Sequence, residues 1–231
     1  MDRVRRVGTY ARLDRDRARR IGVPEVILGE GKTVEHLVGI VRALLDDGRG
    51  GFISRPTAAQ RRALAGISAP QGPLRSLARG RLVRVPGPLD VHYRSGTVAL
   101  LAAGTSDVPV AEEARALLEE LGLEVVHAYD VGVAGLHRLL TALSRLERQN
   151  PETYLVFAGR EGALPTVVAG LVRAPVVGVP TSVGYGRGGR GEAALSAMLQ
   201  SCAPVAVVNI DAAVPAALFA AQRFALRSTK A

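Results

Sequence analysis

Short apolar runs, glycine-marked loops and helix-length segments alternate along the second half of the chain. Four apolar runs, at residues 98–102, 123–127, 154–157 and 176–179, are each followed by a loop and a helical pattern of roughly 10–15 residues. A fifth run at 204–208 precedes a last helical segment at 212–227. This repetition predicts βαβ units around a parallel sheet. The near-continuous Val, Ala and Leu content of the runs favours a sheet covered on both faces.

The first half of the chain has shorter and less regular patterns. Residues 1–22 predict a charged helix or basic arm, because charges of both signs alternate there. The remaining patterns predict strands at 26–28, 52–54 and 82–85 and helices at 33–47 and 57–65. Pro86-Gly87-Pro88 marks our preferred domain boundary. We therefore expect a small N-terminal α/β domain over residues 1–90 and a larger α/β domain over residues 91–231.

The composition is typical of a globular protein, with 48% hydrophobic and 22% charged residues in a chain of 231. No apolar run reaches the length of about 18 residues that a transmembrane helix requires. The basic start of the chain is not followed by the apolar segment of a signal peptide. A single cysteine, Cys202, excludes an internal disulfide framework. Together these features predict a cytoplasmic protein with no membrane partner.

The formal net charge of +9 first suggests a nucleic-acid-binding protein. However, aromatic residues make up only 4% of the chain and tryptophan is absent, so a surface for stacking bases is poorly supplied. Many of the arginines, which crowd residues 3–20 and 75–94, are interpreted as solvated surface. The functional alternative is a pocket for an anionic, phosphate-bearing small molecule, because arginine pairs bidentately with phosphate.

Polar side chains stand in the loops that follow the predicted strands, and in a parallel sheet these loops gather at the edge where ligands bind. Ser106 and Asp107 precede a helix and are either N-caps or ligand contacts. Glu161 lies in another such loop and is a candidate general base. His137, one turn into a helix, is interpreted as a packing residue that could also reach the site. Cys202 precedes the last strand, and a lone cysteine is most often a small apolar residue.

Two glycine-rich segments resemble nucleotide-binding motifs only in part. Residues 29–33 end in Gly-Lys-Thr, but a P-loop requires a glycine where Val26 stands. Residues 186–191 match G-x-G-x-x-G, yet they do not directly follow a strand, so a dinucleotide fingerprint is not expected. Instead we predict a loop that closes over a phosphate, with Arg187 and Arg190 as charge partners. Cys-x-x-Cys is absent, and no structural zinc site is predicted.

Three segments of the larger domain, at residues 103–110, 158–165 and 175–180, resemble the phosphoribosylaminoimidazole carboxylase (PurE) family. This resemblance implies carboxyl-group chemistry on a flavodoxin-like, doubly wound parallel sheet, and assembly as an octamer. The purine enzymes carry histidines in their second and third loops, where this chain has residues 130–135 and 160–162. A purine substrate is therefore disfavoured. A purine-pathway aminoimidazole ribonucleotide carboxylase or mutase stays the alternative enzyme.

Nearly the whole chain from Arg12 is more similar to the LarB family, which acts in the biosynthesis of the nickel-pincer nucleotide, the cofactor of lactate racemase. The shared segments are residues 22–27, 29–33, 129–138, 161–165, 180–186, 201–203 and 207–211. The resemblance implies that CO₂ carboxylates the pyridinium ring of nicotinic acid adenine dinucleotide at its second meta position and that the phosphoanhydride is cleaved. The products would be pyridinium-3,5-biscarboxylic acid mononucleotide and AMP. Mg²⁺ is the expected aid, with no organic cofactor.

The resemblance and the ring chemistry together suggest roles for individual residues. Cys202 is the hypothesised nucleophile and Glu161 the general base, while Ser106 and Asp107 position the carboxyl group. The expected substrate-binding residues are Gly104, Thr105, Asp130, Gly132, Gly159, Gly162, Thr181, Ser182, Gly184, Tyr185 and Lys32. No spacing selects metal ligands. The expected partners are the dinucleotide, CO₂ and further copies of the chain, but not nucleic acid. The alternative from another class is a non-enzymatic nucleotide-binding module.

Overall fold

The computed structural model describes residues 3–226, which form two compact units. The smaller unit consists of residues 3–92 with 225–226, and the larger unit of residues 93–224. No helix among the described residues is long and apolar enough to cross a membrane. Residues 1–2 of the expected basic arm and residue 227, the expected end of the last helix, lie outside the described residues.

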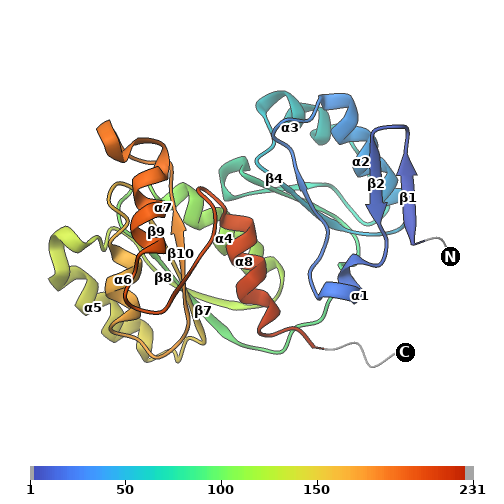
Figure 1. Cartoon of the computed structure of the whole chain (residues 1–231). Helices are drawn as coiled ribbons and strands as arrows, with labels where there is room; N and C mark the ends of the chain where they lie inside the picture. The colour runs from blue at the N-terminus through green and yellow to red at the C-terminus, as the bar shows by residue number, and fades with distance from the viewer. Residues whose placement is uncertain (1–2, 227–231) are drawn as a thin grey trace. The chain divides into compact units, whose positions relative to one another are not determined.

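Five parallel strands form the sheet of the larger unit in the order β11-β10-β9-β7-β8 (Figure 1). Their bounds are Thr97–Ala102 (β7), Glu124–Ala128 (β8), Thr153–Ala158 (β9), Val176–Pro180 (β10) and Val205–Val207 (β11). Each strand begins and ends within one residue of the apolar run that predicted it. Counted from β7, the strand order is 2-1-3-4-5, which is the order of flavodoxin-like folds. The predicted fold class is therefore confirmed.

Helices cover both faces of this sheet. One face is packed by α5 (Leu136–Glu147), α6 (Leu164–Ala169) and α7 (Glu192–Leu199), which share one apolar core. α4 (Val108–Glu120) packs against α8 (Ala213–Gln222), and Figure 1 shows this pair on the opposite side of the sheet from α5. Because both faces are covered, every residue of β9 and β10 is buried. The loops that leave these strands therefore start from fixed positions.

A four-stranded sheet in the order β3-β4-β6-β5 forms the base of the smaller unit. Its strands are Val26–Leu28 (β3), Gly51–Ser54 (β4), Arg75–Leu77 (β5) and Leu82–Val85 (β6). β3 and β4 are parallel, whereas β6 runs antiparallel to both of its neighbours. The helices α2 (Val34–Asp46) and α3 (Ala58–Ala65) begin after Thr33 and Thr57, whose hydroxyls accept capping bonds from backbone N–H groups.

The start of the chain is a β-hairpin, and the charged helix predicted over residues 1–22 is wrong. β1 (Val4–Val7) pairs antiparallel with β2 (Ala11–Asp14), and between residues 3 and 22 only α1 (Arg17–Ile21) is helical. Val7 and Leu13 are buried in the core of the smaller unit. The register pairs Arg5 with Leu13 and Val7 with Ala11, so these four side chains share the face that packs on the unit, whereas Val4, Arg6 and Arg12 are exposed on the other face. Gly8 permits the turn between the strands, because its φ is 52°.

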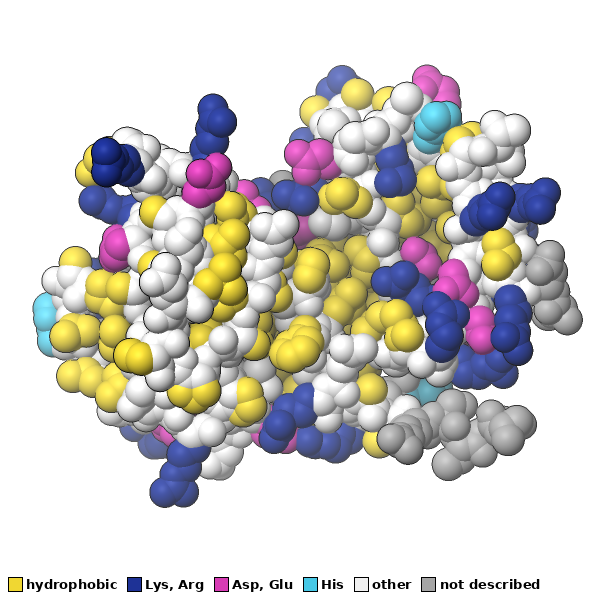
Figure 2. Space-filling model, viewed as in Figure 1, with side chains coloured by type: hydrophobic (Ala, Val, Ile, Leu, Met, Phe, Trp, Pro, Cys, Tyr) yellow, Lys and Arg dark blue, Asp and Glu magenta, His cyan; other side chains and the backbone are white. Residues whose placement is uncertain are grey.

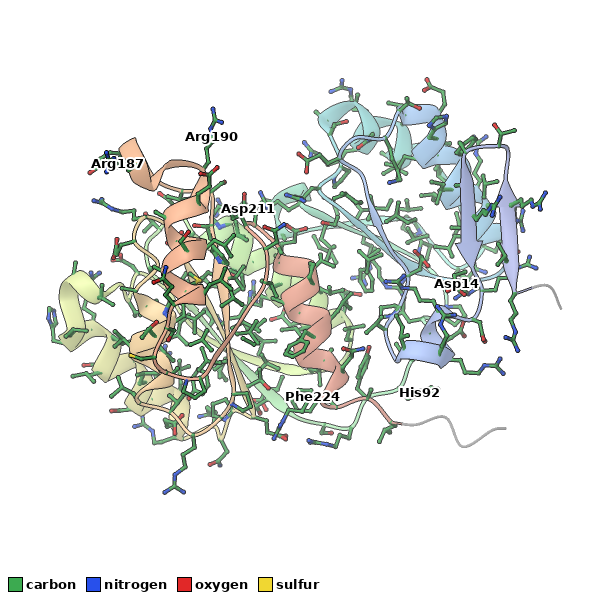
Figure 3. All side chains as sticks on the ribbon, in the orientation of Figure 1. Asp14, His92, Arg187, Arg190, Asp211 and Phe224 are labelled. Carbon is green, nitrogen blue, oxygen red and sulfur yellow. The ribbon has the colours of Figure 1, made fainter. Side chains whose placement is uncertain are left out.

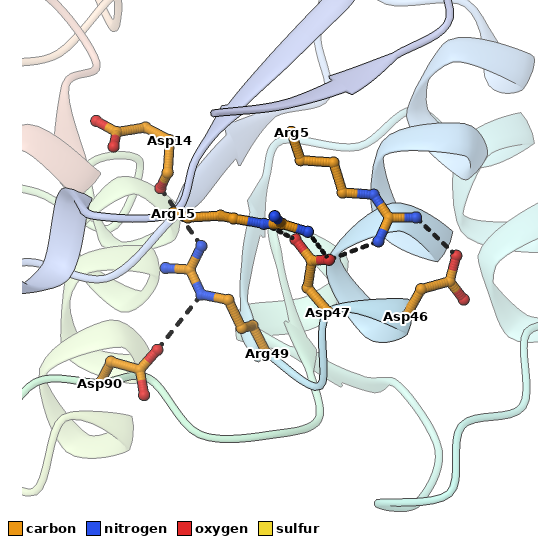
Figure 4. A network of polar contacts seen from close by, with 7 residues as sticks. All are labelled: Arg5, Asp14, Arg15, Asp46, Asp47, Arg49 and Asp90. Carbon is orange, nitrogen blue, oxygen red and sulfur yellow. Dashed lines mark hydrogen bonds and ion pairs between the residues drawn. The ribbon is translucent and has the colours of Figure 1, made fainter. Parts of the chain in front are cut away.

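Arginines of this hairpin region pair with carboxylates at the end of α2 (Figure 4). The Asp47 carboxylate accepts hydrogen bonds from Arg5 Nη1 at 2.5 Å and from Arg15 Nη2 and Nε at 2.5 and 2.8 Å. Only 7% of the Asp47 side chain is exposed, whereas Asp46, which also pairs with Arg5, is 65% exposed. On the face drawn in Figure 2, Lys and Arg side chains of this region lie among Asp and Glu side chains. Part of the basic charge is therefore neutralised within the unit.

Replacing Asp47 by Asn is expected to lower the free energy of unfolding by about 2 kcal/mol at pH 7, because hydrogen bonds to charged groups contribute roughly 1.5–3 kcal/mol. The hydrogen bond from Arg15 is the largest cause that holds the pKa of Asp47 below its ordinary value of 3.8. A carboxylate with a depressed pKa stabilises the fold above the unfolded pKa, and this stabilisation is lost as pH falls. Urea unfolding at pH 7 and at about pH 3 measures both effects.

The difference in stability between the native protein and Asp47→Asn should shrink at the acidic pH. Asp46→Asn is the matched control, since this exposed carboxylate pairs with the same arginine, and it should change the free energy of unfolding by less than about 0.5 kcal/mol. A loss at Asp47→Asn that stays constant from pH 7 to pH 3 would contradict the assignment of the stabilisation to the charged pair.

Candidate active site

A cavity of about 530 Å³ opens at the carboxyl edge of the five-stranded sheet, between the loops that follow β7, β8 and β9. This edge is where doubly wound sheets bind ligands, beside the strand at which the order reverses. Eight of the site residues predicted from the sequence line the cavity: Gly104, Thr105, Ser106, Asp107, Asp130, Gly132, Gly159 and Glu161. The fold thus assembles one polar cavity from three separate stretches of the chain.

Asp107 is the buried anchor of this cavity, with 4% of its surface exposed. Its Oδ1 accepts the hydroxyl of Thr181 at 2.5 Å, and its Oδ2 accepts the N–H of Gly104 at 2.9 Å. The N–H of Gly159 is a further donor to this carboxylate. One side chain therefore joins the loops that follow β7, β9 and β10.

The burial of Asp107 separates its role from that of a simple helix cap. The residue stands at the N-cap position of α4, yet its side chain accepts no capping bond from that helix. Burial raises the pKa of Asp107, while the hydrogen bonds from Thr181, Gly104 and Gly159 act in the opposite direction. Because donors from three loops already occupy its oxygens, Asp107 holds these loops together and does not offer a free carboxylate to a ligand.

Glu161, in contrast, offers an accessible carboxylate at the cavity. Its side chain is 62% exposed, and Oε2 lies 4.0 Å from the Nε of Arg160. Arg160 itself stacks over the ring of Tyr185 at 5.0 Å and donates to its hydroxyl at 3.3 Å. Gly162 completes the turn at φ 64°, where a side chain would meet the backbone of Ala194 in α7 at 2.6 Å. The glycine thus allows α7 to approach closely and keeps Glu161 at the loop tip.

Asp130 and Arg138 form an ion pair at the opposite wall of the cavity. The Arg138 guanidinium donates to the Asp130 carboxylate at 2.6 Å and to its carbonyl at 2.7 Å. Both side chains are well exposed, at 41% for Arg138 and 54% for Asp130. Arg138 and Arg160 both line the cavity, although neither is among the site residues predicted from the sequence. The signal for each was a basic residue within or just after a glycine-containing loop at a strand end.

Several other predicted residues surround the cavity without lining it. The Ser182 N–H donates to Asp211 Oδ1 at 2.9 Å, and this bond joins the β10 loop to the residues after β11. Gly184 has φ 155°, and a Cβ at this position would overlap the carbonyl oxygen of Gly188. Tyr185 is 75% exposed. Through these contacts the segment after β10 is joined to the residues after β11 and to η3 (Gly186–Gly191).

The remaining cationic candidates do not line the cavity. Arg187 and Arg190 belong to the short helix η3 (Gly186–Gly191) and project outward from it (Figure 3). Lys32 belongs to the smaller unit, where its carbonyl accepts the side-chain amide of Gln60 at 2.8 Å. His137, predicted as a packing residue, is instead exposed on α5.

Cys202 lies at the amino-terminal end of the parallel strands, whereas Glu161 lies at their carboxyl end. Cys202 is exposed and precedes β11, whose first residue Val205 pairs with Val176 at the start of β10. Glu161 follows β9, whose end is level with Pro180 at the end of β10. The four residue steps from Val176 to Pro180 span about 13 Å at roughly 3.3 Å per residue. A single chain therefore does not bring Cys202 and Glu161 to the same cavity.

Within the described part of the chain, no three His, Cys, Asp or Glu side chains are grouped so that they could hold a metal ion. The carboxylates of the cavity are dispersed: Asp107 is occupied by hydrogen bonds, Asp130 is paired with Arg138, and Glu161 lies 4.0 Å from Arg160 on its own loop. Mg²⁺ needs only one or two protein carboxylates when substrate phosphates supply its other ligands. The residues present therefore fit a metal that arrives with a phosphate ligand better than a resident one.

Residues 97–231 match the AIR carboxylase family, and residues 4–80 match the LarB/PurE-like N-terminal domain. An uncharacterized protein of Methanocaldococcus jannaschii is 37% identical over 90% of this chain and 82% of its own length. The N5-carboxyaminoimidazole ribonucleotide mutase of the same organism is 30% identical over 56% of this chain and 80% of the mutase. The crystal structure of Treponema denticola PurE, at 26% identity, covers 55% of this chain and 80% of that one with a TM-score of 0.43.

Proposed function

Because this chain belongs to the LarB family, with a LarB/PurE-like N-terminal domain before its AIR carboxylase domain, we propose that it carboxylates the pyridinium ring of nicotinic acid adenine dinucleotide. The family match makes it an enzyme of the carboxylase type. The proposal adds the substrate and a second reaction, hydrolysis of the phosphoanhydride, with pyridinium-3,5-biscarboxylic acid mononucleotide and AMP as the products.

The charge pattern of the cavity is the observation that carries this proposal. Two accessible carboxylates, Asp130 and Glu161, and two guanidiniums, Arg138 and Arg160, line the same space. The proposed substrate combines a cationic ring with an anionic carboxylate and two phosphates, so both signs of charge find partners. Among the described residues that line the cavity there is no histidine. This composition favours the pyridinium substrate over the purine-pathway alternative.

The ring chemistry requires a nucleophile, because an electron-poor pyridinium does not attack CO₂. Addition of a thiolate to the ring carbon para to nitrogen forms a C–S bond and moves an electron pair onto the ring nitrogen. The resulting dihydropyridine is an enamine whose meta carbon attacks the carbon of CO₂. Removal of the proton from that meta carbon then restores the aromatic ring and expels the thiolate. The step is balanced: CO₂ replaces one ring proton, and the thiolate is regenerated.

Glu161 is the residue placed to take that proton. Its carboxylate stands at the tip of an exposed loop on the cavity wall, with no hydrogen bond from another side chain among the contacts of the described residues. The neighbouring Arg160 at 4.0 Å provides a cation for the substrate's carboxylate or phosphate rather than a tight partner for Glu161. Ser106 also lines the cavity, and its proposed role is to hold the carboxyl group that is added.

The thiolate has to come from another copy of the chain, since Cys202 lies at the opposite edge of the sheet from Glu161. We therefore propose that the enzyme works as a homo-oligomer in which Cys202 of one copy enters the cavity of a neighbouring copy. Cys202 is exposed and accessible for such a contact. The octamer implied by the family resemblance is one assembly that provides it.

Hydrolysis of the phosphoanhydride follows from charge neutralisation at the diphosphate. Water attacks one phosphorus, the bridging P–O bond breaks, and the two products carry the two phosphates away. Arg138 and Arg160 are the cations of the cavity that can stabilise the charge on the leaving phosphate. Mg²⁺ would neutralise the same oxygens if it entered bound to the diphosphate.

Incubation of the purified protein with nicotinic acid adenine dinucleotide, ¹³C-bicarbonate and Mg²⁺, followed by mass spectrometry, tests the proposal. We expect a mononucleotide that carries one labelled carboxyl group, together with an equal amount of AMP. Aminoimidazole ribonucleotide is offered in a parallel reaction. Labelled aminoimidazole product with unchanged dinucleotide would reject the proposal in favour of a purine carboxylase.

A further inference from the structure

A second hollow, an open groove of about 980 Å³, runs beside the cavity along the outer strand β8 and the helix α5. The two hollows share one side chain, Arg138, which lines both of them. No residue of the groove has a role in the ring chemistry described above. Its side chains are nevertheless strongly biased in charge, which sets it apart from the cavity.

Among the described residues, the charged side chains that line the groove are all basic. Three arginines, Arg138, Arg145 and Arg148, and two histidines, His127 and His137, contribute to its walls, whereas no Asp or Glu of the described residues lines it. Arg138 is paired with Asp130 of the cavity, but no ion pair to Arg145 or Arg148 is found in the described part of the chain. Arg145 and Arg148 therefore present positive charge that no described acidic side chain pairs with, although the carboxylate of Glu112 accepts a hydrogen bond from the Tyr129 hydroxyl.

Most hydrogen-bond donors of these arginines are unused. Arg145 donates from Nη2 to the carbonyl of His127 at 2.9 Å, and Arg148 donates from Nη1 to the carbonyl of Ser144 at 3.0 Å. A guanidinium has five N–H donors, so several on each remain for a ligand. The bond from Arg145 also satisfies a carbonyl on the free edge of β8, which holds this guanidinium at the groove wall. Such a fork is suited to the oxygens of a phosphate.

The same groove offers aromatic and hydroxyl contacts. The rings of His127 and Tyr129 lie against each other with centroids 4.7 Å apart, and both residues line the groove. Aromatic side chains of this kind stack with nucleobases. The hydroxyls of Thr141 and Ser144 donate to carbonyls within α5, which leaves their oxygens as acceptors for a ribose hydroxyl or a base amino group.

We propose that this groove binds the adenylyl half of the dinucleotide, with Arg138, Arg145 and Arg148 as phosphate contacts and the His127–Tyr129 pair as the stacking surface for the base. This inference rests on the proposed function and specifies where its substrate lies. The pyridinium half occupies the cavity that contains carboxylates, and the phosphates lie near Arg138, where the two hollows meet. The ion pair between Arg138 and Asp130 is exposed and therefore weak, so Arg138 can turn to the phosphates.

Binding of AMP, measured by isothermal titration calorimetry, tests the groove without any need for turnover. Arg145→Gln/Arg148→Gln should weaken AMP binding at least about tenfold, because two charge-assisted contacts are lost. Nicotinic acid mononucleotide lacks the adenylyl half and should bind equally to both proteins. Arg173→Gln removes one exposed arginine near the start of β10, far from the groove, and should leave AMP binding unchanged; compared with Arg148→Gln alone, it is the control matched for net charge.

The outcomes separate the two proposals. Arginine-dependent AMP binding in a protein that does not carboxylate the dinucleotide would support the groove and reject the proposed reaction. Carboxylation with an unaltered KM for the dinucleotide in Arg145→Gln/Arg148→Gln would reject the groove and leave the reaction standing. Equal loss of AMP binding in Arg173→Gln would also reject it, as an effect of charge alone. If the double variant does not fold, Arg148→Gln replaces it, because among the described residues the Arg148 side chain hydrogen-bonds only to the carbonyl of Ser144 in the adjoining α5.

Discussion

Cys202→Ala is expected to lower the rate of ring carboxylation below about a thousandth of the native rate, because alanine cannot form the covalent adduct that makes the ring nucleophilic. The measurement is incorporation of ¹³C from bicarbonate into the mononucleotide, under single-turnover conditions. Cys202 is exposed in a loop, so its replacement should cost less than about 0.5 kcal/mol of stability. Loss of activity would therefore report on chemistry rather than on folding. Full activity in this variant would remove Cys202 from the mechanism.

Mixing of two inactive variants distinguishes a site built by one chain from a site built by two. Glu161→Gln is expected to lose carboxylation as well, since its amide cannot accept the ring proton. If Cys202 and Glu161 of each site come from different copies, co-refolding equal amounts of Cys202→Ala and Glu161→Gln should recover about a quarter of the native activity. The variants refolded separately and mixed only afterwards are the control. No recovery in co-refolded samples would contradict the shared site.

The separation of Cys202 from Glu161 could be predicted from the sequence, although the family motifs suggest that the two residues meet. Both residues lie in segments shared with one family, which suggested that they meet. Yet Cys202 precedes an apolar run and Glu161 follows one. In a parallel sheet these positions lie at opposite edges. What the structure adds is that β9, β10 and β11 are neighbouring strands of the same sheet.

The apolar runs predicted the strands of the larger unit well because the sheet is covered on both faces. A strand such as β9, buried along its whole length, needs an unbroken apolar run. The N-terminal hairpin has no such run: Val7, Ala11 and Leu13 pack on the core, but they are separated by the turn and by the exposed Arg12. In the sequence the arginines and aspartates dominate this segment, and their pairing with α2 depends on residues more than 30 positions away.

The role of Asp107 shows what local sequence cannot reveal about a site. Its position before a helix predicts a cap or a ligand contact. Neither prediction includes a partner that is distant in the sequence. The structure instead gives it a partner 74 residues away, the hydroxyl of Thr181. The buried Asp107 thus holds three loops together through its hydrogen bonds. Arg138 illustrates the reverse case, since a helical arginine carries no signal until Asp130 is seen beside it.

Asp107→Ala is expected to lower carboxylation about a hundredfold or more, because loops displaced by about 1 Å lose productive geometry. The substitution leaves three donors without an acceptor: the hydroxyl of Thr181 and the N–H groups of Gly104 and Gly159, of which Thr181 and Gly159 are buried and Gly104 is half-buried. At roughly 1–3 kcal/mol for each unsatisfied group, partly relieved by water entering the cavity, the free energy of unfolding should fall by about 2–4 kcal/mol. Urea unfolding and the labelled-bicarbonate assay measure the two losses.

The arrangement also predicts how Asp107 and Thr181 depend on each other. Thr181→Val removes one of the three donors while keeping the shape of the side chain, so alone it should cost about 1 kcal/mol of stability. In a protein that already carries Asp107→Ala, the same substitution should cost much less, because the hydroxyl has lost its acceptor. A double-mutant cycle therefore measures the coupling directly. Strictly additive losses in stability and activity would mean that the two side chains act independently, and that the loops are held together by something other than this carboxylate.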